Sequence, residues 1–215
     1  MNTADISGEL NESWNWRYAT KKFDPDKKLD ETDLGTILSA ARMAPTSYGL
    51  QPFHLLAIRD EKLRNRIHSE ASAQAQIIDS QVLVIFSVPE NVTDQQVDSY
   101  IDLLAEQRDM DPAKLQAFAS TIKGSISSMS VEDKQNWSAK QAYLAQGFLL
   151  QAAALLKVDA CPMEGFDQAK LRNVLPNHQA KLPVVMVALG YRSDEDKYAK
   201  LAKVRKGMDD LLTVI

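Results

Sequence analysis

The chain has 215 residues, of which 45% are hydrophobic and 25% are charged. This ordinary globular composition excludes a disordered chain and a collagen, and its length predicts a single domain over residues 1–215. The 25 basic residues against 29 acidic ones give a formal net charge of -4, which argues against a nucleic-acid-binding protein.

Helix signals begin at residue 30. Asp30 can cap a helix that runs to Met43, and apolar residues recur from Leu34 at the i, i+3, i+4, i+7 spacing of one helix face. Thr93 and Gln96 have the spacing of a capping box and precede a second run of this kind. Both segments are therefore predicted to be amphipathic helices.

Two more helices are predicted further along the chain. Asp111 followed by Pro112 places a capping residue before a proline at the first helical position. Ser130 opens the longest candidate, which reaches about Lys157. Its second half, Tyr143–Leu156, is apolar nearly all round, as is typical of a helix in a protein centre or an oligomer interface.

Apolar runs rich in branched residues predict three strands, and a weaker fourth candidate ends the sequence. These segments are Phe53–Ile58, Val82–Val88, Leu182–Gly190 and Leu211–Ile215. Near-continuous apolar strands favour a sheet that is covered on both faces. Because helices separate the strands, we predict a helix-rich α/β or α+β fold with one central sheet.

Targeting signals are not evident. Met1–Asp5 has neither the basic nor the apolar region of a signal peptide, and the longest apolar runs are too short to cross a bilayer. We therefore expect a cytoplasmic protein with no membrane partner.

Several common catalytic motifs are missing from the sequence. It contains no G-x-G-x-x-G, no P-loop and no G-x-S-x-G elbow. His54, His68 and His178 are far apart and lack metal-ligand spacing, so we expect structural or surface roles for them and no metal site. Cys161, the one cysteine, is expected to be a small buried residue rather than a nucleophile.

Two basic clusters and two loops remain as candidate binding elements. They are Arg17 with Lys21 and Lys22; Lys197, Lys200, Lys203, Arg205 and Lys206; Ala44–Pro52; and Cys161–Phe166. Arginine and lysine together suit a phosphate group, although a solvated charged surface would have the same composition. A glycine in a loop lets backbone N–H groups approach a ligand closely.

Taken in order, these pieces resemble the nitroreductase family of FMN flavoproteins, and most closely its branch of oxygen-insensitive NAD(P)H nitroreductases and dihydropteridine reductases. The matching stretches are Arg17–Asp24, Ala44–Pro52, Gln74–Asp79, Trp137–Leu144, Pro162–Asp167 and Leu201–Arg205. The resemblance implies an α+β (α/β-like) fold, with a central mixed sheet flanked by helices in an interlocked homodimer. The long apolar helix would form much of the interface, the C-terminal tail would add a strand to the partner's sheet, and two FMN sites would lie between the subunits.

The same resemblance implies roles for individual residues. Arg17 would reach the phosphate or ribityl end of FMN, and Lys21 would act at the N1/O2 edge of the ring as a catalytic charge. The backbone N–H of Glu164, with that of Gly165, would address the flavin near N5. The other cofactor-binding residues would be Tyr18, Ala19, Pro45, Thr46, Ser47, Gln51, Gln74, Gln76, Pro162, Met163, Lys203 and Arg205. The last two would hold the phosphate, and the residues from 45 to 51 would come largely from the partner subunit.

The sequence departs from the family pattern at three positions. Ala19, Gly49 and Ala73 stand where the family often has Ser, Asn and Asn, and the departure around Ala73 extends to Gln76, which stands where a Lys is common. The stretch of residues 109–131 matches no motif and is expected to cover the substrate mouth.

The implied activity is ping-pong hydride transfer from NADH or NADPH, through N5 of FMN, to small-molecule acceptors such as nitroaromatics, quinones or pterins. The alternatives are a flavin reductase or another small-molecule reductase of this fold, and a non-catalytic FMN-binding dimer. The sequence leaves the nicotinamide preference and the physiological acceptor open.

Overall fold

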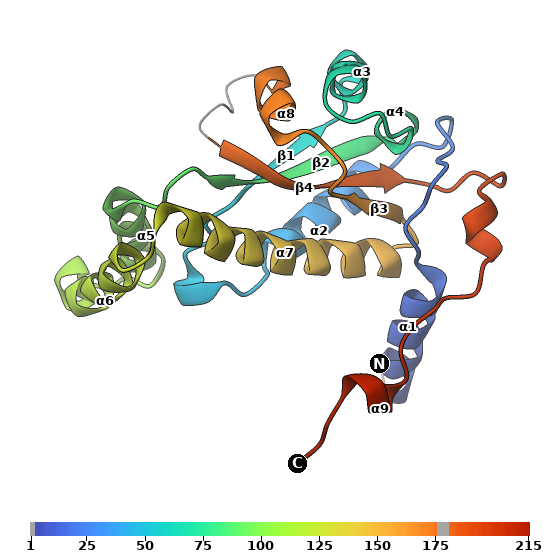
Figure 1. The fold of residues 1–215 in the computed structure, drawn as a ribbon. Helices are drawn as coiled ribbons and strands as arrows, with labels where there is room; N and C mark the ends of the chain where they lie inside the picture. The colour runs from blue at the N-terminus through green and yellow to red at the C-terminus, as the bar shows by residue number, and fades with distance from the viewer. Residues whose placement is uncertain (1–2, 176–180) are drawn as a thin grey trace.

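The computed structural model describes residues 3–175 and 181–215, so His178 lies outside the described residues. Four strands form one sheet in the order β1-β2-β4-β3, and neighbouring strands are antiparallel (Figure 1). The strands are β1 His54–Ile58, β2 Val82–Pro89, β3 Asp159–Met163 and β4 Lys181–Gly190. A parallel component enters through an isolated bridge between Ala19 and Ala160.

Helices make up most of the remaining regular structure. They are α1 Thr3–Trp16, α2 Glu31–Arg42, α3 Glu61–Glu70, α4 Gln76–Asp79, α5 Asp94–Gln107, α6 Gln116–Ser127, α7 Val131–Leu155, α8 Gln168–Val174 and α9 Met208–Leu211, with 3-10 turns η1 Ser47–Gly49, η2 Pro112–Leu115 and η3 Lys197–Lys200. Within the described residues, no helix is long and apolar enough to cross a membrane.

The predicted helix starts are confirmed by their capping hydrogen bonds. The Asp30 carboxylate accepts from the backbone N–H of Thr32 at 2.7 Å. Thr93 and Gln96 form both bonds of a capping box, and the Ser130 hydroxyl accepts from the Asp133 N–H at 3.1 Å. Each of these bonds satisfies a donor that the first helical turn would leave unpaired.

The sheet has an apolar core on each face, as the continuous apolar strands predicted. One core packs α2 and α7 against Val82, Val84 and Phe86, and the other packs α3, α4 and α8 against Leu83 and Ile85. Figure 1 shows these two helix layers on opposite sides of the sheet. The side chains of β2 alternate between the two cores because successive residues of a strand point to opposite faces.

A third apolar cluster lies beyond the sheet, between α5, η2 and α6. Its fully buried side chains include Val97 and Ile122, while Tyr48 and Trp137 pack against it from outside. The helix predicted after Asp111 and Pro112 is present in this cluster. Its first turn is the 3-10 turn η2, and the α-helix α6 begins at Gln116. In Figure 1 this helix pair lies at the far end of α7 from α1.

Two sequence expectations are corrected. Residues 161–163 were expected to be in a loop but belong to β3, where Pro162 is tolerated because β3 is at the edge of the sheet. The strand expected over Leu211–Ile215 is not formed in the single chain: α9 ends at Leu211 and the remaining residues are exposed. The helices α1, α3 and α8 were not predicted.

Candidate functional site

Basic side chains from the two ends of the chain meet in one hollow. Arg17, directly after α1, and Lys203 and Arg205 from the C-terminal segment line a cavity of about 420 Å³, which we call the cationic groove. The Lys203 ammonium donates to the backbone carbonyls of Trp14 and Arg17, which fixes the C-terminal segment against α1. Tyr18, Ala19 and Lys21 complete its wall.

The charges of this groove repel one another. Burial lowers the pKa of Arg17, and the nearby charge of Arg205 lowers it further. Burial also lowers the pKa of Lys203, with added repulsion from Arg17 and Arg205. A bound anion would relieve this repulsion, so the three cations form an electrostatically prepared anion site.

Residues 17–22 are not helical, because α1 ends at Trp16. A buried carboxylate holds this segment instead. Asp196, which is 3% exposed, accepts hydrogen bonds from the Tyr18 hydroxyl at 2.9 Å and from the backbone N–H groups of Lys21 and Lys22 at 2.7 and 3.0 Å. It also accepts from the N–H of Tyr198 at 2.9 Å.

These bonds decide the charge state of Asp196. Burial by itself would raise the pKa of Asp196, but the hydrogen bonds from Lys22, Lys21, Tyr198 and Tyr18 outweigh burial and lower it. Burial and the bond to Asp196 raise the pKa of the Tyr18 hydroxyl. Near neutral pH the carboxylate is therefore an acceptor and the hydroxyl a donor.

A second buried carboxylate supports the same segment from the sheet side. Asp159, at the start of β3, pairs with Arg192 at 2.6 Å and accepts from the Thr20 hydroxyl at 3.1 Å. The Arg192 guanidinium lies 4.2 Å from the ring centroid of Trp16 and 4.6 Å from that of Tyr18. This stacking fixes the orientation of the Tyr18 ring at the groove.

The groove continues along β3. Ala19 bridges Ala160 in parallel, which aligns the segment after α1 with this edge strand. Beyond the bridge, the Lys21 ammonium lies 3.9 Å from the Cys161 sulfur, as does the Gln76 amide nitrogen. Cys161 is fully buried, as expected, and burial raises the pKa of its thiol.

The loop after β3 is fastened to the segment before α4. The carbonyl of Gly165 accepts hydrogen bonds from the Ser72 hydroxyl at 2.7 Å and from the Gln74 amide at 3.0 Å. A side chain at position 165 would begin 3.2 Å from the Gln74 nitrogen, so glycine permits this close approach. Gln74, Gln76 and the loop after β3 therefore gather at one end of the strand.

The loop of residues 44–52, here called the hydroxyl loop, lies elsewhere in the subunit. The backbone N–H of Ser47 in this loop donates to the side-chain oxygen of Gln141 on α7 at 2.9 Å. The helix α1, which leads to the groove, contacts α7 further along: the Trp14 indole donates to the side-chain oxygen of Gln151 at 2.6 Å. Ten residues of helix separate these contacts by about 15 Å. Within one chain the predicted residues Pro45, Thr46, Ser47 and Gln51 therefore do not line the cationic groove.

Backbone geometry shapes the hydroxyl loop. Tyr48, Gly49 and Gln51 have φ values of 59°, 78° and 47°. The Tyr100 hydroxyl, from α5, donates to the Tyr48 carbonyl at 2.7 Å, and a Cβ at Gly49 would lie 2.7 Å from that hydroxyl oxygen. Tyr100 therefore occupies the space that a side chain at position 49 would need.

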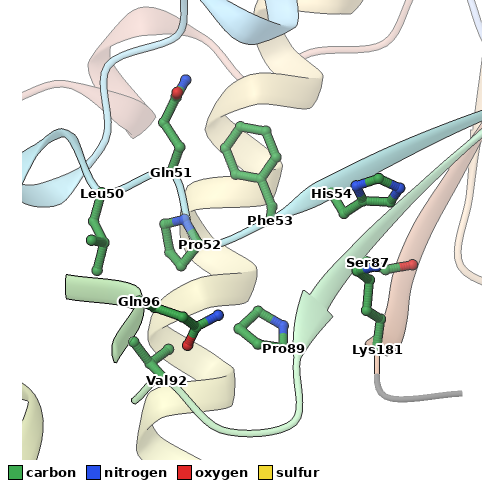
Figure 2. A pocket seen from close by; sticks show the side chains of 10 residues that line it. All are labelled: Leu50, Gln51, Pro52, Phe53, His54, Ser87, Pro89, Val92, Gln96 and Lys181. Carbon is green, nitrogen blue, oxygen red and sulfur yellow. The ribbon is translucent and has the colours of Figure 1, made fainter. Parts of the chain in front are cut away.

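A small hollow lies on the other side of the hydroxyl loop (Figure 2). Its walls include Pro52 of the loop, Phe53 directly after it, Val92 and Gln96 from before and within α5, and Lys181 at the start of β4. The volume is about 130 Å³, whereas cofactor pockets usually exceed about 300 Å³. This hollow is therefore too small for a flavin ring.

The outer face of α7 is apolar and open. Leu144, Phe148 and Leu155 are each more than 40% exposed, and they line a hollow of about 540 Å³ together with Tyr143 and Ala152. The inner face, which includes Leu149, is buried against the sheet. The apolar residues on one side of this helix therefore pack in the core, and those on the other side form an exposed apolar patch.

The predicted site residues thus divide into two sets. One set gathers around the cationic groove and β3: Arg17, Tyr18, Ala19, Lys21, Gln74, Gln76, Pro162, Met163, Glu164, Gly165, Lys203 and Arg205. The other set is the hydroxyl loop. Asp159 and Asp196 were not predicted, because neither lies in a sequence motif. Their hydrogen-bond partners Thr20 and Tyr18 are about 140 and 180 residues away in the sequence.

No group of three or more His, Cys, Asp or Glu side chains is placed to hold a metal ion in the part of the chain that the structure describes.

Comparison with known proteins shows the family and the fold of the chain. The family model described as "Nitroreductase family" matches residues 15–191. The "Putative NAD(P)H nitroreductase" of Staphylococcus epidermidis is 32% identical over 215 residues, which cover 95% of this chain and 96% of that protein. Among solved structures, a nitroreductase-like protein from Streptococcus mutans superposes with a TM-score of 0.84 at 20% identity, over 100% of both chains. A "putative nitroreductase in complex with FMN" from Exiguobacterium sibiricum superposes with a TM-score of 0.80 at 18% identity, covering 96% of this chain and 97% of that one.

Proposed function

The chain belongs to the nitroreductase family, and on this premise we propose that residues 1–215 form one FMN-binding domain of an NAD(P)H-dependent oxidoreductase. The acceptors would be nitroaromatics, quinones or pterins, reduced in a ping-pong cycle. The active form would be a homodimer with its FMN sites between the subunits. The FMN bound by the Exiguobacterium relative supports the choice of cofactor.

The observation that carries the proposal is the meeting of Arg17, Lys203 and Arg205 in one groove. Burial and neighbouring cations lower the pKa values of Arg17 and Lys203, so a concentrated negative charge would suit the groove, and the phosphate of FMN is a dianion near neutral pH. Arginine supplies forked donors and lysine a point charge, which is the usual combination for phosphate. These residues would hold the phosphate end of the cofactor.

The polar groups along β3 fit the rest of FMN. The Lys21 ammonium and the Gln76 amide converge beside Cys161, and both can donate to the carbonyl oxygens at the pyrimidine edge of the ring. The loop after β3 would present the backbone N–H groups of Glu164 and Gly165 at the N5 and O4 side. In this proposal the groove cations would meet the phosphate and the donors along β3 would meet the ring.

When bound, FMN would supply the redox chemistry, accepting a hydride at N5 and passing two electrons to the acceptor. Lys21 would stabilise negative charge at the N1/O2 edge. Glu164 would act through its backbone N–H at N5. Burial, together with the Glu164 side chain, raises the pKa of Tyr143 to about 12, which keeps that α7 hydroxyl protonated.

The proposed dimer is supported by two features of the single chain. The hydroxyl loop lies away from the groove, so a second subunit is needed to bring Thr46 and Ser47 to the flavin. The exposed apolar face of α7, with Phe148 43% exposed, offers the surface on which that subunit would pack. A C2 dimer formed through this face would build two equivalent sites.

The test is a visible spectrum of the purified protein, recorded before and after anaerobic addition of NADPH or NADH. We expect two flavin bands that bleach with the donor and return on addition of a nitroaromatic or a quinone. Bands that persist with both donors would contradict the enzyme and favour a flavin-binding dimer. A colourless protein that takes up no added FMN would contradict the cofactor itself.

A further inference from the structure

Asp196 joins two parts of the site that are far apart in sequence. Its Oδ2 atom accepts from the Tyr18 hydroxyl and from two consecutive backbone N–H groups, those of Lys21 and Lys22. Its Oδ1 atom caps η3 through the N–H of Tyr198. The same carboxylate therefore fixes the bend that carries Lys21 and the start of the chain segment that leads to Lys203.

The charge of Asp196 is unfavourable for an anion site. A carboxylate near the cationic groove repels phosphate, and its burial adds a desolvation penalty. Surface screening does not remove this repulsion, because Asp196 is 3% exposed. Its contribution to phosphate binding must therefore come from the geometry that it imposes on its donors.

We propose that Asp196 is a positioning residue that sets Lys21 and the Lys203 segment in register, so that both ends of FMN are bound at once. This inference rests on the proposed function for its ligand, but the arrangement that it invokes belongs to the chain alone. Asparagine at this position retains one acceptor oxygen and places an NH₂ group against N–H or O–H donors. Asp196→Asn therefore removes the charge that repels phosphate and also disturbs the hydrogen bonds, and these two changes have opposite effects on FMN binding.

The matched control is Asp194→Asn, which removes the same charge two residues away at an exposed position. Charge alone predicts that both variants bind FMN as tightly as the wild type or more tightly. The positioning role predicts that Asp196→Asn weakens FMN binding about tenfold or more, while Asp194→Asn does not. The two accounts thus differ in the sign of the effect, which flavin fluorescence quenching measures.

A second readout needs no flavin. Hydrogen exchange of the unliganded protein should show faster exchange of the Lys21, Lys22 and Tyr198 amides in Asp196→Asn, with other segments unchanged. If that variant fails to fold, Tyr18→Phe removes one of the four donors and should weaken FMN binding by a smaller factor. Unchanged or tighter FMN binding by Asp196→Asn, or unchanged exchange at these amides, would overturn the inference.

Failure of the proposed function would look different. If the wild-type protein takes up no FMN, the same pair of variants is compared for binding of inorganic phosphate. Weaker phosphate binding and faster amide exchange in Asp196→Asn alone would then still support the positioning role, and equal binding by both variants would refute it.

Discussion

The two halves of the proposed site are built from different forces. The cationic groove is an arrangement of charges, in which repelling cations line the cavity and buried carboxylates such as Asp196 hold the backbone behind them. The hydroxyl loop has left-handed residues held by hydrogen bonds, such as that from Tyr100 to the Tyr48 carbonyl. The groove should therefore respond to pH and charge, and the loop to steric change.

A substitution on the apolar face of α7 should have the largest effect on FMN binding, because the two subunits would meet at this face and so bring the groove and the hydroxyl loop together. Phe148→Asp places a charge at the centre of this face, and burying an unpaired carboxylate in an interface costs several kcal/mol. We expect a monomer with no measurable FMN binding, detected by light scattering and the flavin spectrum. Asn136→Asp adds the same charge at an exposed site on α7 and should leave the dimer intact.

A change in the groove should reduce FMN binding without reducing stability. Arg17→Ala removes charge-assisted hydrogen bonds to the phosphate, which are worth about 1.5–3 kcal/mol, or about 10- to 100-fold in affinity. It also relieves the repulsion that lowers the pKa of Lys203, so the melting temperature of the unliganded protein should not fall. Titration with FMN measures the affinity, and a thermal melt of the unliganded protein measures the stability. A large fall in melting temperature with unchanged FMN affinity would contradict this prediction.

A change in the hydroxyl loop, in contrast to one in the groove, should reduce the stability of the unliganded protein. Gly49→Ala forces a Cβ into left-handed backbone and to 2.7 Å from the Tyr100 hydroxyl, so unfolding free energy should fall by about 2 kcal/mol. In a Tyr100→Phe background the contact disappears, and the same substitution should cost only about 1 kcal/mol. Equal costs in both backgrounds, measured by denaturant unfolding, would show that Tyr100 does not constrain this position.

The smallest effect is a pH dependence confined to the groove. The pKa of Lys203 is below its usual 10.5 because of burial and neighbouring cations. A phosphate binds its charged form, so FMN affinity should be constant well below that lowered pKa and should weaken as pH rises through it. Lys203→Arg remains charged and should flatten this decline, which fluorescence titrations from about pH 7 to 9.5 would reveal. A decline of equal size in the variant would assign it to another group.

The comparison also shows what the sequence could predict. Local signals located α2, α5 and α7, because Asp30, Thr93 and Ser130 bond to donors three residues away or fewer. They did not locate β3, because a five-residue edge strand that contains Cys161 and Pro162 has no pattern of its own and depends on pairing with β4. They also gave no sign of α3, whose polar sequence between residues 61 and 70 buries only Arg64 and Ile67.

The same limit applies to the site. Arg17, Lys21, Lys203 and Arg205 could be proposed from residue type and resemblance, and the structure brings all four to the cationic groove. Asp196 could not be proposed, because a single aspartate in a charged turn is indistinguishable from a solvated one until its partners are known. The separation of the hydroxyl loop from the groove likewise depends on the path of α7 and not on any local pattern.

The central claim is that each FMN site takes its groove from one subunit and its hydroxyl loop from the other. A mixing experiment tests it most directly, using Lys203→Glu to disable the groove and Ser47→Glu to disable the loop. Each variant alone should bind no FMN. After denaturation and refolding of an equal mixture, half of the dimers are mixed and each has one intact site, so about a quarter of all sites should bind FMN again. If the mixture binds no more FMN than the separate variants, both elements serve the same chain's site and the account is wrong.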